Sequence, residues 1–159
     1  ARAGMDSGVA TRPIADWDAY LQSLNEFVYH SGLIMKPVFS QAKRDPKRIV
    51  FAEGEDERVL RAVQVVLDEG ICRPILIGRI DEIQRKIAAA GLRLRPGQDF
   101  EVIHHERCPF FIENFDLYWQ EYHRLMERKG VSVDYARREI GRRATLYGSL
   151  MVRLGHADG

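Results

Sequence analysis

The sequence predicts an α/β fold in which parallel strands alternate with helices. Residues 48–52 form a short apolar run, and residues 74–78 form a second one. Between them, residues 56–69 carry apolar side chains at helical spacing, and Gly70 follows as a helix stop signal. Two strands joined by one helix within about 30 residues form a βαβ unit, in which the strands are parallel and the crossover is right-handed.

A helical segment is expected before this unit. Residues 1–15 contain glycines and an Arg-Pro pair, which predict irregular structure. Asp16 is a suitable N-cap for a helix whose apolar positions recur at helical spacing until Ser31-Gly32. A second, short helix is expected to start near Pro37, because proline is tolerated in the first turn.

The alternation of elements continues after the second strand. Asp81 is the expected N-cap of a helix that ends at Ala90 before a glycine, and residues 100–104 are expected to form a third strand. A long helix is expected from Pro109 to Lys129. Its core-facing stripe would consist of Phe111, Phe115, Tyr118, Tyr122 and Leu125.

One more helix is expected at the end of the sequence. Ser132 is its expected N-cap, and apolar side chains keep helical register from Ala136 to Leu154. Gly141 and Gly148 interrupt this pattern and are expected to weaken or kink the helix.

The composition bounds the class of protein. The chain has 159 residues, of which 45% are hydrophobic, and this is enough for one sizeable core. Its net charge is +1. Basic residues are interleaved with acidic ones, so we expect no nucleic-acid partner. No stretch approaches the roughly 18 apolar residues of a membrane span, and no signal peptide is recognisable. Cys72 and Cys108 are expected to be reduced thiols, which predicts a cytoplasmic location.

The turn after the first strand is one candidate site, because open α/β sheets bind ligands where strand ends meet helix N-termini. Glu53, Glu55, Asp56 and Glu57 crowd this turn. Acids here stabilise the positive end of the helix dipole by roughly 0.3–1 kcal/mol each, so simple capping also explains them. A P-loop is excluded, because Gly54 is the only glycine of the turn and the acids would repel phosphate.

Histidine and cysteine side chains gather after the third strand. His104, His105 and Cys108 lie within five residues, and His123 follows. Imidazole and thiolate bind zinc, but a structural site needs four ligands paired across tight turns, so we expect no metal here. A Cys-His nucleophile is not expected either, because no feature of the sequence lowers the pKa of the thiol.

Arginines concentrate on the last expected helix. Arg137, Arg138, Arg142 and Arg143 occupy two adjacent turns and could bind a phosphate or the pyrophosphate of CoA through paired hydrogen bonds. The alternative is a solvated face on which Glu139 pairs with Arg143, worth a few tenths of a kcal/mol. The sequence favours this alternative, since surface arginines are common and most bind no ligand.

Four motifs in order resemble the amino-terminal part of the phosphate acetyltransferase family. They are the first strand with residues 53–60, the strand exit at 76–78, residues 129–131, and residues 147–159. Two further segments look like the tail of the catalytic part of a bacterial hybrid malic enzyme. They are residues 7–14 with the helix that follows, and residues 31–39.

This resemblance implies a function and a domain organisation. In such hybrids, a malic enzyme that oxidatively decarboxylates malate to pyruvate, with NADP and a divalent metal (Mg or Mn), is fused to a phosphate acetyltransferase-like domain. Residues 1–43 would be a mainly helical tail or linker from the malic enzyme core. Residues 44–159 would be the amino-terminal part of the appended domain, which is implied to sense acetyl-CoA or CoA. We expect a homo-oligomer.

Both ends of the sequence look cut, since it opens on Ala1 and stops before an apolar element that would close a domain. We therefore expect a fragment that holds no cofactor and no catalytic residue of its own. Active transferases of the family tend to carry an arginine where this chain has Met126, and methionine cannot pair with phosphate. This favours sensing over the alternatives, which are a genuine phosphate acetyltransferase and a part that mainly assembles subunits. The expected effector-binding residues are Arg128, Lys129, Arg142, Arg143 and Tyr147.

Overall fold

The computed structural model describes residues 5–9, 14–28, 30–104 and 108–159. The chain divides into two compact units, residues 1–41 and 42–159. The sequence suggested a domain boundary at residues 43 and 44, and the assignment of the first part to a malic enzyme core stays a prediction.

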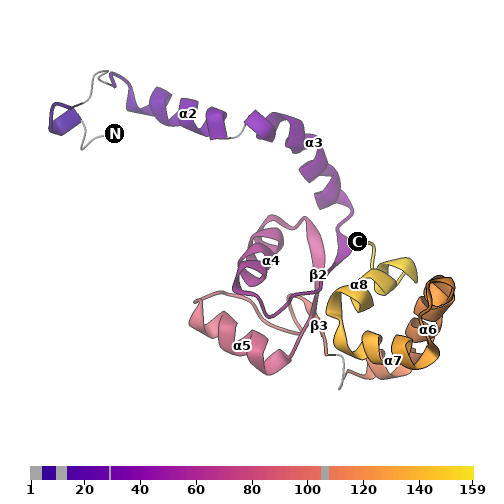
Figure 1. Ribbon diagram of the computed structural model, residues 1–159. Coiled ribbons are helices and arrows are strands. Elements are labelled where there is room, and N and C mark those ends of the chain that lie inside the picture. Colours follow the sequence, from indigo (N-terminus) through magenta and orange to yellow (C-terminus); the bar gives the residue numbers. More distant parts are fainter. Residues whose placement is uncertain (1–4, 10–13, 29, 105–107) are drawn as a thin grey trace. The chain divides into compact units, whose positions relative to one another are not determined.

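The first unit contains α2 (Trp17–Val28) and most of α3 (His30–Arg44) (Figure 1). The side chain of Asp16 accepts hydrogen bonds from the amides of Asp18 (2.9 Å) and Ala19 (3.0 Å), which confirms the expected cap. The second helix differs from the expectation, because it begins at His30 and contains Pro37 in its interior. A proline there removes one rung of the hydrogen-bond ladder, and the rest of this helix continues across it.

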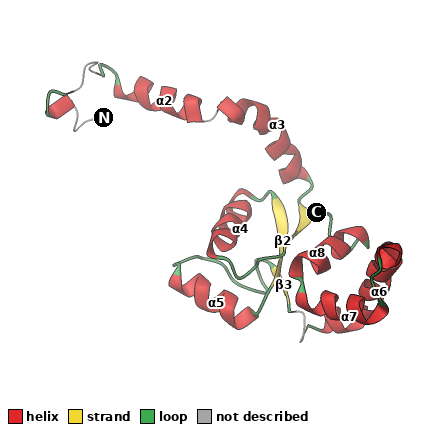
Figure 2. Cartoon of the chain, in the orientation of Figure 1, coloured by secondary structure: helices red, strands yellow, loops and turns green. Residues whose placement is uncertain are grey.

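Within the described residues, the second unit contains a three-stranded parallel sheet in the order β1-β2-β3 (Figure 2). The strands are β1 (Lys47–Phe51), β2 (Cys72–Ile77) and β3 (Glu101–Ile103). Val50 lies opposite Ile75 in the parallel register, and Leu76 lies opposite Val102. The helices are α4 (Glu57–Glu69), α5 (Ile80–Ala89), α6 (Pro109–Met126), α7 (Val133–Arg142) and α8 (Ala144–Arg153). The predicted α/β fold with a parallel βαβ unit is confirmed.

Both faces of the sheet are covered by helices (Figure 2). Successive residues of a strand point to opposite faces, so Ile75 and Ile77 join the core of α6, α7 and α8, whereas Leu76 joins the core of α4 and α5. Each such side chain contributes roughly 1.5–3 kcal/mol when it leaves water completely. The continuous apolar pattern of β2 follows from this double burial.

The helix ends explain which predicted caps are present. Asp56 caps α4 by accepting from the amide of Arg58 at 2.8 Å, and Ser132 caps α7 by accepting from the amide of Tyr135 at 3.2 Å. The expected cap Asp81 is wrong, because α5 begins at Ile80 and its N-cap residue is Arg79, two positions before Asp81. The amide of Arg79 instead bonds the carboxylate of Glu55, which belongs to a different loop.

The last predicted helix is two helices, α7 and α8, which meet at Arg143 in extended conformation. The break does not coincide with either glycine. Gly148 lies on the buried face of α8, where a Cβ atom would sit 3.5 Å from side-chain atoms of Ile77 and Val50. The bend at Arg143 therefore lets α8 lie against the sheet, and Gly148 lies where the helix comes closest to the strands.

Two differences concern α6. It ends at Met126 and is followed by a short 3₁₀ turn, Glu127–Lys129. Phe111, Tyr118 and Tyr122 are buried as predicted, and Trp119 joins them, but Leu125 is exposed on the outer face. No described helix is both long and apolar enough to cross a membrane.

Residues 158 and 159 lie along the outer edge of β1. The amides of Asp158 (2.8 Å) and Gly159 (3.3 Å) donate to the carbonyl of Arg48, and the amide of Val50 donates to the carbonyl of Gly159 at 2.7 Å. The amide of Arg48 donates to the side chain of Asp158 at 2.8 Å. These bonds continue the hydrogen-bonding pattern of the sheet on the far side of β1 from β2.

Candidate functional site

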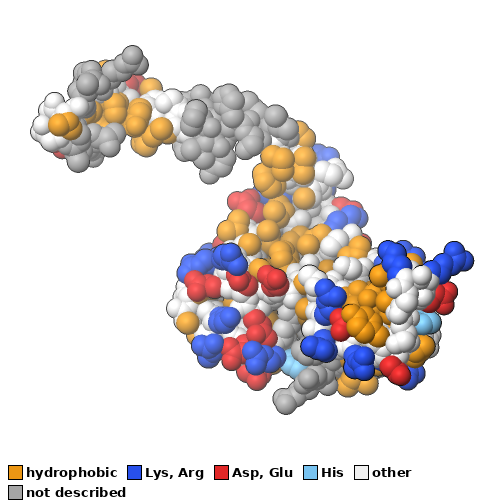
Figure 3. Space-filling view, in the orientation of Figure 1, with side chains coloured by type: hydrophobic (Ala, Val, Ile, Leu, Met, Phe, Trp, Pro, Cys, Tyr) orange, Lys and Arg blue, Asp and Glu red, His pale blue; other side chains and the backbone are white. Residues whose placement is uncertain are grey.

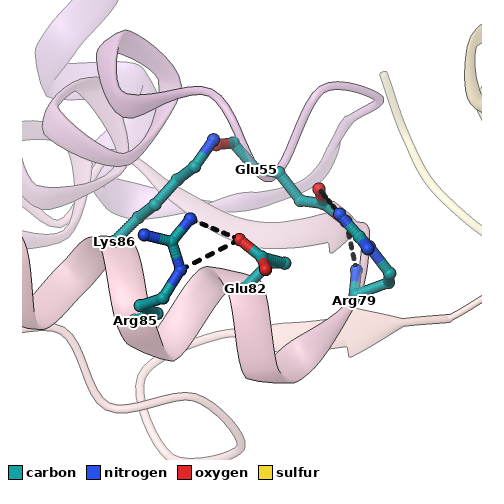
Figure 4. A network of polar contacts seen from close by, with 5 residues as sticks. All are labelled: Glu55, Arg79, Glu82, Arg85 and Lys86. Carbon is teal, nitrogen blue, oxygen red and sulfur yellow. Dashed lines mark hydrogen bonds and ion pairs between the residues drawn. The ribbon is translucent and has the colours of Figure 1, made fainter.

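The turn after β1 is tied to the turn after β2 by Glu55 (Figure 4). One carboxylate oxygen of Glu55 accepts from the amide of Arg79 at 2.8 Å and from its Nε at 3.0 Å, and the other accepts from Nη2 at 3.0 Å. The Nζ of Lys86 donates to the backbone carbonyl of Glu55 at 2.6 Å. Glu82 and Arg85 form a further pair beside it on α5, at 2.7 Å. We call this set the strand-helix joint.

Two glycines allow the turns to come this close. A Cβ atom on Gly54 would lie 2.8 Å from Cβ of Leu76 and 2.9 Å from the carbonyl oxygen of Ile77. A Cβ atom on Gly78 would lie 2.9 Å from Cγ of Glu55. The amide of Gly54 uses the approach to donate to the carbonyl of Ile77 at 3.1 Å. Gly54 therefore allows the close contact between the first turn and β2.

The electrostatics of the joint indicate that Glu55 holds the two turns together and does not transfer protons. The hydrogen bonds from Arg79 lower the pKa of Glu55 to about 2, against a desolvation effect that would raise it. Asp56 likewise has a pKa lowered to about 2, mainly by the side chain of Arg58. Carboxylates that stay ionised at neutral pH and already accept several hydrogen bonds are poor general acids or bases. Capping of α4 accounts for Asp56, and the ion pair with Arg79 accounts for Glu55.

The arginine-rich helix face contains paired and unpaired cations. Arg143 lies 3.6 Å from Glu139, which is the pair expected for a solvated face. The guanidinium of Arg137 lies over the ring of Trp119, 4.3 Å from its centroid, in a cation–π contact. Arg138 and Arg142 are exposed and make no ion pair with any residue that the structure describes.

The other two predicted cations are at the opposite end of α7. Arg128 and Lys129 lie on the exposed 3₁₀ turn that precedes α7, whereas Arg142 and Arg143 lie at the bend that follows it. A helix of ten residues is about 15 Å long, so the four cations do not converge on one point. Only an extended ligand with several phosphates could meet both pairs.

The fifth predicted residue, Tyr147, is fully buried. Its ring stacks on Tyr118 with 4.5 Å between centroids, and burial raises the pKa of its hydroxyl. That hydroxyl has no hydrogen-bond partner among the described residues. Tyr147 therefore supports the core in this conformation, while the four cations are the predicted residues that solvent can reach.

A neighbouring polar contact was not predicted. The hydroxyl of Tyr118 lies 2.6 Å from Nδ1 of His156, and burial raises the pKa of Tyr118 to about 12. His156 also packs edge-on against Phe110, with 5.2 Å between the ring centroids. No local sequence signal links residues 118 and 156, because the contact depends on how α6 and α8 pack.

The other candidate sites are weaker. A surface cavity of about 300 Å³ lies between α4 and the segment before β3, but its arginines, Arg93 and Arg95, are already paired with Asp68 and Asp99. Among the described residues, no three His, Cys, Asp or Glu side chains are grouped as metal ligands. His104 follows the end of β3 and Cys108 is the N-cap residue of α6, while His105 lies outside the described residues.

Malic enzymes match almost the whole chain. This chain is 49% identical over 158 residues to the NADP-dependent malic enzyme of Salmonella typhimurium. It is 51% identical over 159 residues to the NAD-dependent malic enzyme of Rhizobium meliloti. Each match covers 99% of this chain but 20% of the malic enzyme. The chain therefore spans about a fifth of the length of these relatives.

Phosphate acetyltransferases match a shorter part. The chain is 33% identical to the phosphate acetyltransferase of Thermoanaerobacterium thermosaccharolyticum over 126 residues, which are 79% of this chain and 35% of that enzyme. Among solved structures, a phosphotransacetylase from Streptococcus pyogenes has the same fold, with a TM-score of 0.60 and 24% identity over 79% of this chain and 36% of that one.

The family model described as phosphate acetyl/butaryl transferase matches residues 33–159. This span contains the whole sheet, the strand-helix joint and all four predicted cations, and the resemblance expected from the sequence motifs is confirmed. The chain belongs to the phosphate acetyl/butaryl transferase family.

Proposed function

We propose that this chain is the acetyl-CoA-sensing regulatory part of an NADP-dependent malic enzyme, which converts malate to pyruvate by oxidative decarboxylation. The observation that carries the proposal is the combination of two matches. Residues 33–159 match the transferase family, yet three NADP-dependent malic enzymes match 99% of the chain at 46–49% identity. A part with a transferase fold inside an oxidoreductase is suited to binding acetyl-CoA as a signal.

The unpaired cations support an anionic effector. Arg142 and Arg128 are exposed and have no acidic partner among the described residues, so a phosphate would not have to displace one. Lys129 lies beside Arg128 on the same turn. Met126, which is half-buried against the aromatic core at the end of α6, offers no charge to a transferring group. This favours binding of CoA phosphates without transfer.

Regulation of this kind requires that acetyl-CoA bind one state of the enzyme more tightly than another. NADP and the divalent metal, Mg or Mn, would be held by other parts of the malic enzyme, of which this chain spans about a fifth. We expect the enzyme to be a homo-oligomer in the cytoplasm. Subunit contacts would then transmit the presence of the effector.

The direct test is a titration of acetyl-CoA against the full-length enzyme during malate oxidation with NADP. We expect the rate or the half-saturating malate concentration to change with acetyl-CoA and to level off at saturation. CoA without the acetyl group is the comparison ligand. Unchanged kinetics at saturating acetyl-CoA would remove the regulatory proposal.

The role of the cations is tested by the double variant Arg142→Ala/Arg143→Ala. We expect the half-maximal acetyl-CoA concentration to rise roughly tenfold or more, as charge-assisted phosphate contacts are lost. The matched control is Arg58→Ala/Arg61→Ala, which removes two exposed arginines that pair with Asp56 and Glu57. Equal responses in the two double variants would clear Arg142 and Arg143 of any effector contact.

The second candidate is a phosphate acetyltransferase that moves acetyl between CoA and orthophosphate. It is favoured by the 33% identity to a named phosphate acetyltransferase over 79% of the chain. Measuring acetyl phosphate formation by the full-length protein separates the two candidates. Turnover at a rate typical of enzymes, about 1–1000 per second, would favour the transferase.

A further inference from the structure

Helix α2 carries an apolar stripe that is partly open to solvent. Trp17, Tyr20, Leu21 and Leu24 follow the spacing i, i+3, i+4, i+7, which places them on one face of a helix. Leu21 is 53% exposed and Leu24 is 40% exposed. We call these four residues the α2 stripe.

Leu21 and Leu24 are the exposed part of this stripe, and covering them would stabilise the helix. It has 12 residues, and isolated helices of about 12–15 residues are only marginally stable in water. Most helices in proteins obtain their stability by packing an apolar face against another element. Exposed apolar side chains gathered on one face are therefore typical of an interaction surface.

The comparisons indicate where that partner lies. The family model begins at residue 33, so α2 precedes the part shared with phosphate acetyltransferases. Malic enzymes, in contrast, match 99% of the chain. The segment that contains α2 is thus matched by malic enzymes, and four fifths of their length lies outside this chain.

A second copy of α2 is a weaker candidate for the partner. Helices that pair with each other through an apolar seam usually sustain the pattern over three or four heptads, which is about 21–28 residues. Helix α2 has 12 residues, from Trp17 to Val28, and is shorter than such a seam. It fits a groove on a larger folded body better than a copy of itself.

We propose that α2 is a docking helix whose stripe packs against the malate-oxidising portion of a malic enzyme polypeptide. The inference rests on the proposed function, because it requires that portion to exist. It adds a physical connection between the sensing part and the catalytic part, made by Trp17, Tyr20, Leu21 and Leu24.

Cross-linking tests the contact directly. The full-length enzyme would carry the photoreactive residue p-benzoylphenylalanine in place of Leu21, and peptides joined after irradiation would be identified by mass spectrometry. The matched control carries the same residue in place of Leu117, which is 45% exposed on α6 inside the family-matched part. We expect position 21, and not position 117, to cross-link to the malate-oxidising portion. Cross-links to a second α2, to residues 42–159, or to nothing would overturn the proposal.

A stability measurement supplies a second readout. We expect Leu21→Ser/Leu24→Ser to lower the temperature at which malate oxidation is lost by several degrees, because the catalytic portion loses a packed surface. The control Leu117→Ser/Leu125→Ser changes two leucines of similar exposure, 45% and 40%, on α6. Equal shifts in both double variants would contradict docking through α2.

The outcomes also separate this inference from the proposed function. If unsubstituted full-length protein oxidises malate but ignores acetyl-CoA, the sensing proposal fails while the cross-link still decides docking. If the protein does not oxidise malate, the proposed function itself fails. If it oxidises malate and responds to acetyl-CoA without the cross-link, the docking proposal alone is wrong.

Discussion

The strand-helix joint and the bend between α7 and α8 are both rich in charge, but they use it differently. At the joint, Glu55 accepts three hydrogen bonds from Arg79, and Asp56 accepts from Arg58. At the bend, Arg142 has no ion pair with any described residue, and Arg143 has one at 3.6 Å. Charge density alone therefore does not identify a ligand site. The fraction of charges left without a protein partner is the better guide.

The largest expected effect of a substitution is at the joint. Gly54→Ala should destabilise the protein by about 3 kcal/mol, because the new Cβ atom would meet a backbone oxygen that cannot move aside. Gly141→Ala is the matched change beside the bend, where a Cβ atom meets nothing within 4 Å. It should raise stability by about 0.5–1 kcal/mol, as expected when alanine replaces a glycine within a helix. Urea unfolding of both variants checks this, and similar values would break the comparison.

A smaller effect is expected from Glu55→Ala. The variant leaves Arg79 without its carboxylate and should cost about 1 kcal/mol, a low value because Glu55 keeps some contact with solvent. Glu53→Ala changes an exposed acid two positions earlier and should stay within about 0.5 kcal/mol of the unsubstituted protein. The two unfolding free energies are measured side by side. If Glu53→Ala costs as much as Glu55→Ala, the joint is not held by this ion pair.

The acid range sharpens the comparison further. The pKa of Glu55 is lowered from 4.5 to about 2 in the folded protein. A lowered pKa means that the contribution of Glu55 to stability is complete above pH 4.5 and is lost as the pH falls towards 2. Unfolding free energies measured from pH 5 to pH 2.5 should fall less steeply in Glu55→Ala than in the unsubstituted protein. Parallel slopes would show that Glu55 has an ordinary pKa.

The smallest effect on stability is expected at the bend. Arg142→Ala/Arg143→Ala removes two exposed side chains and one weak ion pair, so the unfolding free energy should change by less than about 0.5 kcal/mol. This is why the same double variant is suited to testing effector binding. Thermal unfolding without acetyl-CoA provides the measurement. A loss of more than about 1 kcal/mol would mean that these arginines support the fold.

Much of the fold could be predicted from the sequence, because local signals agree with the final packing. Apolar runs predicted β1 and β2, and the side chains of Asp56 and Ser132 cap the helices that follow them. The expectations failed where a distant contact replaced a local one. The amide of Arg79, the N-cap residue of α5, donates to Glu55 from 24 residues away, so a search for a local cap selected the wrong residue.

The candidate site was predicted less completely for the same reason. The arginines of α7 are visible as a dense run, and the pair of Glu139 with Arg143 follows from helical spacing. The burial of Tyr147 and its stacking on Tyr118 depend on the bend at Arg143, which no glycine or proline marks. The contact of His156 with Tyr118 joins residues 38 positions apart.

The bonds between Arg48 and residues 158 and 159 bear on how the protein folds during synthesis. β1 leaves the ribosome before the other two strands of this sheet, but its outer edge is covered by residues that are translated 110 positions later. Contacts of such long sequence separation form late and slow the folding of a chain. A nascent polypeptide would therefore expose an unpaired strand edge while α4 to α8 are being made, which is the interval in which chaperones protect growing chains from aggregation.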